Sequence, residues 1–392
     1  MKPLASRVAD FAPSPFAAMT ALALEHGAVN LGQGFPDFAP PDFVLAAAKE
    51  AFSSNLHQYA PPRGHGRLQR AVSETLASNL GFTPDPESEV TITVGATQAM
   101  YSSIQALLEP SDEAIILEPT YDMYAPQVWL SGGVAKYLPL EAENNFALNL
   151  EKLRALCSSK TKILILNTPN NPTGKVFNRT ELEGIAALAL EFDFYVLSDE
   201  AYDWLVYGAN HISIASLPGM RERTVTIGSA GKMFSVTGWR IGWATASPSI
   251  SAAIRRGAQW VSFAAATPVQ EAIAIALEQT RQNNYFQSFQ AQMADRRDLL
   301  AQILKNAKLE FWQPDGGYFI NADTSRFPGD TNDLAKRFVQ EIGVAAMPMQ
   351  MFYSSDHAHV APKALRFAFC KTRETLQAAG ERLTKEALQK LL

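Results

Sequence analysis

The chain has 392 residues, of which 47% are hydrophobic, and its formal net charge is −5 at pH 7. This length exceeds what one hydrophobic core usually serves, so we expect two domains around a shared cleft. The small acidic excess excludes a general electrostatic attraction to nucleic acid or to anionic membranes, and any anionic ligand therefore needs a local site.

The two cysteines, Cys157 and Cys370, cannot form a disulfide framework, and their scarcity is typical of a cytoplasmic protein. Prolines interrupt the N-terminal segment, which argues against a signal peptide. Apolar runs such as 162–166 are far shorter than the roughly 20 residues that a membrane helix requires. We therefore expect a cytoplasmic protein without a membrane span.

Short, β-rich apolar runs alternate with longer amphipathic stretches between about residues 40 and 285. This alternation predicts an α/β large domain, a three-layer structure around a mostly parallel sheet. Most of the runs are apolar throughout, as is typical of strands that helices cover on both faces. In chain order, the expected strands are 90–94, 114–117, 163–166, 195–197, 225–227 and 241–244, with a helix over 97–108 after the first.

The pattern changes near residue 285. A long helix through about residue 305 is followed by expected strands over 310–323 and 364–370, which predicts a smaller α+β C-terminal domain over 286–392. The proline-interrupted segment 1–39 is expected to pack with that small domain. Residues 40–285 then form the large domain.

Five polar clusters directly follow predicted strands. In open parallel sheets the ligand crevice lies outside the carboxyl ends of the strands. We therefore predict that the five clusters converge on one crevice. They are 95–97, 118–121, 167–174, Asp199 with Tyr202, and Ser229 with Lys232.

Lys232 and its neighbours indicate a covalently held, phosphorylated ring cofactor. Ser229 and Arg240 flank Lys232, and Asp199 lies one structural unit earlier. Pyridoxal phosphate fits this set, since its aldehyde needs a primary amine, its phosphate needs donors and its pyridine nitrogen needs an acid. Lys232 would form the Schiff base, and its freed amine could then move the proton at the substrate's α-carbon. The alternatives are a surface lysine and a structural acid.

A phosphate site is predicted at the start of the helix that follows the first strand. Gly95, Ala96 and Thr97 would offer free backbone N–H groups there, although Thr97 could also be an ordinary N-cap. Ser229 and Arg240 supply a hydroxyl and a guanidinium on a neighbouring segment, which favours the phosphate.

Two further polar groups have a predicted role near the ring. Tyr202 and Asn171 could donate hydrogen bonds to its phenolic oxygen, although the run 170–174 could also be simply a turn. Glu118–Pro119 and Asn171–Pro172 both follow strands, and we predict that at least one of these bonds is cis, since a sharp turn would aim a side chain inward.

Arg366 lies between apolar neighbours in a predicted strand. Bidentate pairing with a substrate carboxylate would explain why this charged side chain is placed among apolar residues. A salt bridge to an acidic residue of the protein is the alternative explanation. His357 and His359 are more typical of loop residues than of metal ligands, and we expect no metal.

These motifs resemble the fold type I pyridoxal phosphate enzymes, and among them the class I/II aminotransferases of the kynurenine and methionine aminotransferase branch. The resemblance spans about Phe16 to Lys371. The segments that carry it, in the family's order, are 32–38, 95–97, 121–122, 170–172, 198–202, 229–232, 238–240 and 316–319.

The resemblance implies a role for each matching residue. Lys232 would carry the cofactor, Asp199 would meet the pyridine nitrogen, and Tyr121 would stack on the ring. Tyr59 matches a tyrosine that the family sends across a dimer interface to the partner's phosphate, which implies a homodimer. The remaining cofactor residues would be Gly95, Ala96, Thr97, Asn171, Tyr202, Ser229 and Arg240, and the substrate carboxylate would meet Gly34, Asn171 and Arg366.

The leading functional hypothesis is an aminotransferase that passes an amino group from a neutral L-amino acid to a 2-oxo acid. Methionine, phenylalanine, glutamine and kynurenine are candidate donors, because the expected pocket is aromatic and holds no second carboxylate-binding arginine. β-Elimination from cysteine conjugates on the same cofactor is the alternative, and a non-catalytic ligand-sensing domain is a third. The expected pocket residues are Phe16, Tyr101, Tyr121, Phe263 and Phe352.

Overall fold

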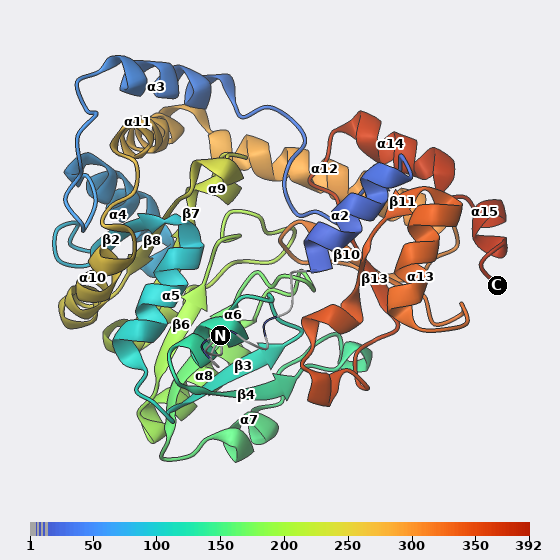
Figure 1. The fold of residues 1–392 in the computed structure, drawn as a ribbon. Coiled ribbons are helices and arrows are strands. Elements are labelled where there is room, and N and C mark those ends of the chain that lie inside the picture. The colour runs from blue at the N-terminus through green and yellow to red at the C-terminus, as the bar shows by residue number, and fades with distance from the viewer. Residues whose placement is uncertain (1–4, 6–7, 9–10, 12–14) are drawn as a thin grey trace.

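The computed structural model describes residues 5, 8, 11 and 15–392. A seven-stranded sheet forms the centre of its larger part (Figure 1). Its β8 (Ile241–Thr245) runs antiparallel to both neighbours, whereas the pairs from β7 (Thr224–Ser229) to β4 (Val134–Pro139) are parallel. The order across the sheet is β2 (Val90–Val94), β8, β7, β6 (Tyr195–Asp199), β5 (Thr161–Asn167), β3 (Glu113–Glu118) and β4.

Apolar side chains alternate between the two faces of this sheet, and each face is covered by helices. In β5, Leu164 and Leu166 belong to one buried cluster and Ile163 and Ile165 belong to another. This explains why residues 163–166 of the strand are all apolar, as expected from the sequence. The first cluster includes residues of α7 (Leu150–Leu156) and α8 (Arg179–Phe192), and the second includes residues of α5 (Gly95–Leu107), α6 (Tyr124–Leu130) and α10 (Pro248–Ser262).

Local signals in the sequence fix several helix ends. Asn178 and Glu181 form a capping box that starts α8, and Pro268 lies at the start of α11 (Thr267–Asn283). The helix α11 packs on α3 (Asp42–Ser53) and α4 (Gly66–Leu80).

A four-stranded antiparallel sheet organises the smaller part. Its order is β12 (Met347–Pro348), β13 (Ala364–Ala368), β10 (Phe319–Asp323) and β9 (Phe311–Trp312). The long helix α12 (Tyr285–Asn306) leads into it, as the sequence predicts (Figure 1). The other helices here are α13 (Thr331–Arg337), α14 (Arg373–Arg382) and α15 (Lys385–Gln389).

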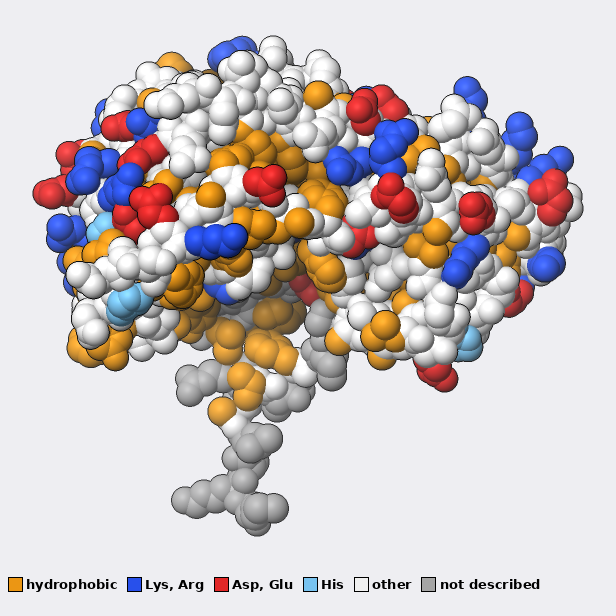
Figure 2. Space-filling model, turned by 90° about the horizontal axis from the view of Figure 1, so that it is seen from above, with side chains coloured by type: hydrophobic (Ala, Val, Ile, Leu, Met, Phe, Trp, Pro, Cys, Tyr) orange, Lys and Arg blue, Asp and Glu red, His pale blue; other side chains and the backbone are white. Residues whose placement is uncertain are grey.

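From residue 15 to residue 30 the N-terminal segment packs on this smaller part, whereas the Phe11 ring lies 6.1 Å from the Trp129 ring of α6. The strand β1 (Val29–Asn30) pairs in parallel with β11 (Val344–Ala345), and α2 (Pro15–Glu25) contacts β11 (Figure 1). Viewed from above, hydrophobic side chains gather along the zone where the two lobes of the molecule meet (Figure 2). The exact division at residues 39/40 and 285/286 stays a prediction.

Short elements complete the chain. They are α9 (Ala230–Met233), the 3-10 helices η1 (Ala142–Asn144), η2 (Ile214–Ser216), η3 (Arg221–Arg223), η4 (Thr237–Trp239), η6 (Met349–Phe352) and η7 (Ser355–His357), and the π-helix η5 (Phe338–Ile342). In the part of the chain that the structure describes, no helix has the length and apolar character needed to cross a bilayer.

The structure corrects two expectations about strands and confirms the one about proline. The sequence pattern does not predict β4 or the two-residue strands β1, β11 and β12, and the region 310–323 holds two short strands, β9 and β10, separated by a loop, instead of the single expected strand. Both Glu118–Pro119 and Asn171–Pro172 are cis, and so is Thr168–Pro169.

Candidate active site

A cavity of about 260 Å³ lies where the strands of the large sheet end, and all five polar clusters supply residues to it. Predicted residues that line it are Phe16, Gly34, Ala96, Thr97, Tyr121, Asn171, Asp199, Tyr202, Ser229, Lys232, Arg240 and Arg366. Its other lining residues are Gln33, Phe35, Met123, Tyr124, Asn167, Ala201, Thr237 and Phe319.

Lys232 reaches the cavity from α9, the short helix that directly follows β7. Its Nζ donates a hydrogen bond to the Gly34 carbonyl at 3.0 Å and lies 5.4 Å from the centres of the Tyr202 and Tyr318 rings. Burial lowers the pKa of the Lys232 amine to about 8. Near neutral pH a useful fraction of this amine is therefore uncharged, which a nucleophile or a base requires.

Asp199 ends β6 and is buried. The Tyr124 hydroxyl donates to its Oδ2 at 2.7 Å, and the Ala201 backbone N–H donates to its Oδ1 at 3.1 Å. Burial raises the pKa of the Asp199 carboxyl, and these two hydrogen bonds oppose that rise. The carboxylate is thus held in one orientation on the cavity wall, where it suits a cationic ring nitrogen.

Hydrogen-bond donors for an anion meet at the start of α5. Arg240 donates from Nη2 to the Thr97 Oγ1 at 3.2 Å and from Nη1 to the Thr237 carbonyl at 3.2 Å. The helix begins at Gly95, and its N-cap Val94 makes no side-chain cap, so the alternative reading of Thr97 as an ordinary N-cap is wrong. The first N–H groups of α5 therefore remain available for a phosphate.

Gly95 does not line the cavity, but this anion site depends on it. Its φ is +73°, and a Cβ at this position would lie 2.5 Å from the Arg240 Nη2. Only glycine adopts this conformation without strain and leaves room for the guanidinium. Gly95 therefore acts through its lack of a side chain.

Arg366 also lines the cavity. It lies in β13 opposite Asn321 and is 1% exposed. Its Nη1 donates to the Asn171 Oδ1 at 2.7 Å and its Nη2 donates to the Gly32 carbonyl at 2.9 Å, so both of these acceptors are neutral. Among the described residues its buried Nε–H has no hydrogen-bond partner. Burial lowers the pKa of the Arg366 guanidinium to about 10, which indicates a cation that gains from an anionic ligand.

Aromatic rings surround this guanidinium. Its central carbon lies 3.9 Å from the centre of the Phe319 ring, 4.6 Å from that of Phe352 and 5.3 Å from that of Phe16. Close packing also explains Gly34, because a Cβ there would lie 2.4 Å from Phe319 Cζ. Phe352 does not line the cavity and instead backs Arg366.

Three other aromatic residues named from the sequence lie away from the cavity. Phe263 follows α10 and is 47% exposed, with its ring edge-on to Tyr59, which is 86% exposed. Tyr101 is half-buried on α5, one turn beyond the cavity residue Thr97. The expectation that Tyr101 and Phe263 form the pocket therefore does not match this cavity.

The most informative residue that sequence reasoning missed is Tyr124, because it orients Asp199. Its signal was its position three residues after Tyr121, in the first turn of a helix that follows a strand end. Gln33, Phe35 and Phe319 lie inside motifs that carried the resemblance, so the motifs marked the right segments.

Pyridoxal phosphate fits this set of residues. An amine, an oriented carboxylate, an anion site and a buried guanidinium line one cavity, and Asn171 keeps its Nδ2 donor while its Oδ1 accepts from Arg366. The described residues contain no cluster of three or more His, Cys, Asp or Glu side chains that could hold a metal ion. The geometry suits an amino acid held by its carboxylate beside an amine and a ring.

Comparisons with known proteins agree with this reading. Residues 26–383 match the family "Aminotransferase class I and II". The chain is 39% identical over 409 residues to kynurenine–oxoglutarate transaminase 1 of Mus musculus, which covers 97% of this chain and 96% of the mouse chain. Among solved structures, YbdL from Escherichia coli, described as having a methionine aminotransferase function, superposes with a TM-score of 0.93 at 34% identity and covers 98% and 100% of the two chains.

A third relative has a different named substrate. The N-succinyldiaminopimelate aminotransferase of Mycobacterium tuberculosis is 38% identical, with a TM-score of 0.92 and coverage of 97% and 99%. With a family match over most of the chain and relatives above 30% identity along nearly all of it, the protein belongs to the class I and II aminotransferases, the pyridoxal phosphate-dependent enzymes that include the kynurenine and methionine aminotransferases.

Proposed function

We propose that this aminotransferase moves the amino group of a neutral L-amino acid to a 2-oxo acid. The observation that carries the proposal is the environment of Arg366. Its guanidinium is buried, its Nε–H has no hydrogen-bond partner among the described residues, and the rings of Phe16, Phe319 and Phe352 surround it. One carboxylate can pair there, while the adjoining wall is apolar.

The roles of the residues follow from their positions. Arg366 and the Gly34 segment bind the substrate carboxylate, and Asn171 joins the two sites because its Oδ1 accepts from Arg366 while its Nδ2 can donate to the ring. The start of α5, with Ser229 and Arg240, binds the phosphate. Tyr121 would cover the ring, and Asp199, oriented by Tyr124, would keep the ring nitrogen protonated.

When bound, pyridoxal phosphate accepts the amino group and withdraws electrons from the substrate's α-carbon. Lys232 supplies the covalent attachment, and its amine then moves the α-proton. Burial favours this second role, because it lowers the pKa of the amine to about 8 and brings it close to a physiological pH.

The named relatives do not decide the substrate. Relatives of similar identity are named for kynurenine and for N-succinyldiaminopimelate, and the YbdL structure is described for methionine. The residues that face the substrate side chain therefore decide selectivity. Phe16, Phe35 and Tyr121 on the cavity wall favour a neutral side chain.

A panel of amino donors tests this proposal. We expect kcat/KM for methionine, phenylalanine, glutamine or kynurenine to exceed that for aspartate by at least about 10-fold, since a second carboxylate would lose its hydration against the aromatic wall. The assay follows formation of the 2-oxo acid from each donor at constant acceptor. If aspartate were the preferred donor, the proposed neutral selectivity would be wrong.

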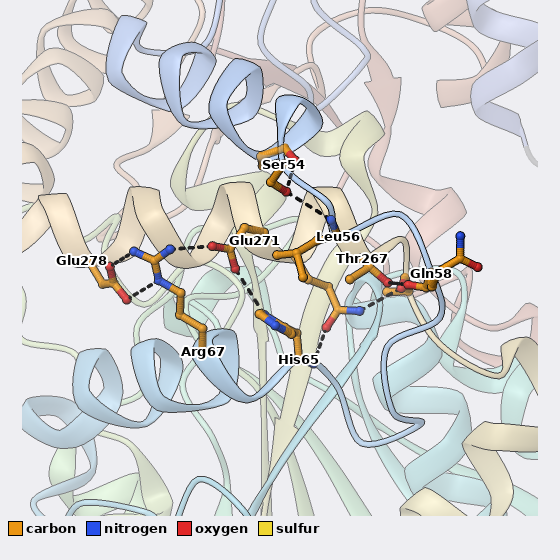
Figure 3. A network of polar contacts seen from close by, with 11 residues as sticks. Ser54, Leu56, Gln58, His65, Arg67, Thr267, Glu271 and Glu278 are labelled. Atoms are coloured by element: carbon orange, nitrogen blue, oxygen red, sulfur yellow. Dashed lines mark hydrogen bonds and ion pairs between the residues drawn. The ribbon is translucent and has the colours of Figure 1, made fainter.

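We also propose that the enzyme is a cytoplasmic homodimer in which Tyr59 reaches the phosphate of the partner subunit. Tyr59 is 86% exposed and Trp260 is 84% exposed, a costly state for two large aromatic side chains. Hydrogen bonds to α11 nevertheless hold the chain on both sides of Tyr59 in place (Figure 3). Thr267 Oγ1 donates to the Gln58 carbonyl at 2.6 Å, and the His65 N–H donates to Gln270 Oε1 at 2.7 Å.

A hybrid of two variants tests the contribution of Tyr59. In a symmetric dimer, pairing Lys232→Ala with Tyr59→Ala subunits restores one complete site, since Lys232 comes from one subunit and Tyr59 from the other. At limiting cofactor, a 1:1 mixture that has been dissociated and reassociated should regain about a quarter of wild-type activity. Activity no greater than the mean of the two parents would contradict a shared site.

A further inference from the structure

Glu118 is a fully buried carboxylate beside the cavity that the chemistry above does not use. It ends β3 and is 0% exposed. A buried carboxylate is costly unless donors satisfy it. The Ser354 N–H donates to its Oε1, while His357 Nδ1 lies 2.7 Å from its Oε2 and the Ser354 hydroxyl lies 3.4 Å from the same atom.

All of these partners come from residues 352–357, which we name the latch segment. It lies in the connection between β12 and β13, two strands of the four-stranded sheet. Glu118 instead ends β3 of the seven-stranded sheet. A backbone hydrogen bond adds to the junction, because the Thr120 N–H donates to the Phe352 carbonyl at 2.8 Å. Glu118 thus fastens one sheet's strand end to a loop of the other.

The latch segment leads directly to the substrate-carboxylate site. It begins with Phe352, which is 1% exposed and lies 4.6 Å from the Arg366 guanidinium and 6.2 Å from the Phe16 ring. On the other side, Tyr121 lies three residues after Glu118 and lines the cavity. Glu118 therefore connects Tyr121 of the cavity wall, along the chain, with Phe352 on Arg366, through the latch segment.

Glu113, at the opposite end of the same strand, shows how a purely local acid is placed. It is paired with Lys136 at 3.4 Å and accepts a hydrogen bond from Ser158 at 2.7 Å. Lys136 lies in β4 of the same sheet, and Ser158 lies just before β5. Glu113 therefore holds only that sheet, and it provides a matched control for Glu118.

We propose that Glu118 is a positioning residue for the substrate-carboxylate site: it holds the latch segment against β3 so that Phe352 stays packed on Arg366. The inference rests on the proposed role of Arg366 toward the substrate carboxylate. The Phe352 ring excludes water from the Arg366 guanidinium. The attraction between the guanidinium and a carboxylate is then stronger, because less water is present to screen the two charges. Loosening the latch segment weakens carboxylate binding and leaves the proton transfer by Lys232 unchanged.

The test compares Glu118→Gln with Glu113→Gln in the cofactor-loaded enzyme. We expect Glu118→Gln to raise KM for the amino donor roughly tenfold, while kcat changes less than about twofold, because only binding of the carboxylate is lost. Glu113→Gln should leave KM and kcat close to the wild-type values. Thermal unfolding of both variants reports any general loss of stability.

Two inhibitors separate positioning from general damage. 3-Phenylpropionate carries the carboxylate and phenethylamine lacks it, so Glu118→Gln should weaken only the first. His357→Ala leaves the Ser354 N–H in place and should also weaken binding of 3-phenylpropionate. This variant keeps the test available if Glu118→Gln does not fold. Equal weakening of both inhibitors, or no more weakening than in Glu113→Gln, would overturn the inference. Failure of wild-type enzyme to transaminate would instead overturn the proposed function.

Discussion

Replacing Lys232 by alanine is expected to lower kcat for amino transfer by at least about 10³-fold, since the variant loses both the covalent attachment and a general base, whose own contribution is 10²–10⁴-fold. Among the residues that the structure describes, no amine other than that of Lys232 lines the cavity, and burial lowers the pKa of this amine to about 8. Steady-state rates of 2-oxo acid formation measure the loss.

Lys232→Arg is the control for charge. Arginine keeps a cation near the Gly34 carbonyl and the Tyr202 ring, the contacts that Lys232 makes. It cannot be deprotonated in a protein, so it cannot act as the nucleophile or the base. Both variants should be equally inactive and should unfold near the wild-type temperature. Transamination by either variant at the wild-type rate would contradict the assigned role.

Arg366→Lys is expected to lower kcat/KM for every amino acid donor by about 10²-fold, or about 2.7 kcal/mol, which is near the lower end of the cost of disrupting a buried, hydrogen-bonded charge pair. Lysine keeps the charge but cannot reproduce the fork that bonds Asn171, the Gly32 carbonyl and a carboxylate together. Most of the loss should appear in KM, because the carboxylate is bound before and during the reaction.

Arg255→Lys is the matched control for Arg366→Lys. Arg255 is partly buried and donates to Thr91 Oγ1 at 3.0 Å and to the Val90 carbonyl at 2.8 Å, but it lies on α10 outside the cavity lining. Its replacement should leave kcat/KM within about twofold of wild type, as expected for sites away from the reacting groups. An unchanged KM in Arg366→Lys would show that the carboxylate binds elsewhere.

The sequence predicts the large sheet well because its buried strands are short apolar runs with polar residues at their ends. The strand β4 is different, since its sequence Val134–Pro139 mixes a lysine and a proline with apolar residues at the edge of the sheet and most of it is not fully buried. Edge strands bury fewer of their side chains, so the apolar pattern in their sequence is weaker. The loop between β9 and β10 contains Pro314, Asp315, Gly316 and Gly317, which are typical turn residues, so the sequence itself carries the break that divides the single expected strand into two.

The cavity was predictable where a residue follows a strand directly, as Asp199 and Lys232 do. The direction of a side chain from a helix or a partner element was not predictable, because it depends on tertiary packing. Tyr101 and Phe263 are aromatic but lie away from the cavity, whereas Tyr124 enters it and bonds Asp199. Position at a strand end therefore predicts which residues line the cavity more reliably than aromatic residue type does.

Tracing the amino nitrogen tests the central claim most directly. Wild-type holoenzyme is supplied with a ¹⁵N-labelled neutral donor, such as methionine or phenylalanine, and a 2-oxo acid, and the products are resolved by mass spectrometry. Amino transfer predicts that the label appears in the amino acid formed from the acceptor, in equal amount to the 2-oxo acid formed from the donor. With a cysteine conjugate as donor, label released as ammonia together with pyruvate, without need for an acceptor, would instead show β-elimination. Absence of label in the new amino acid for every donor would contradict the account.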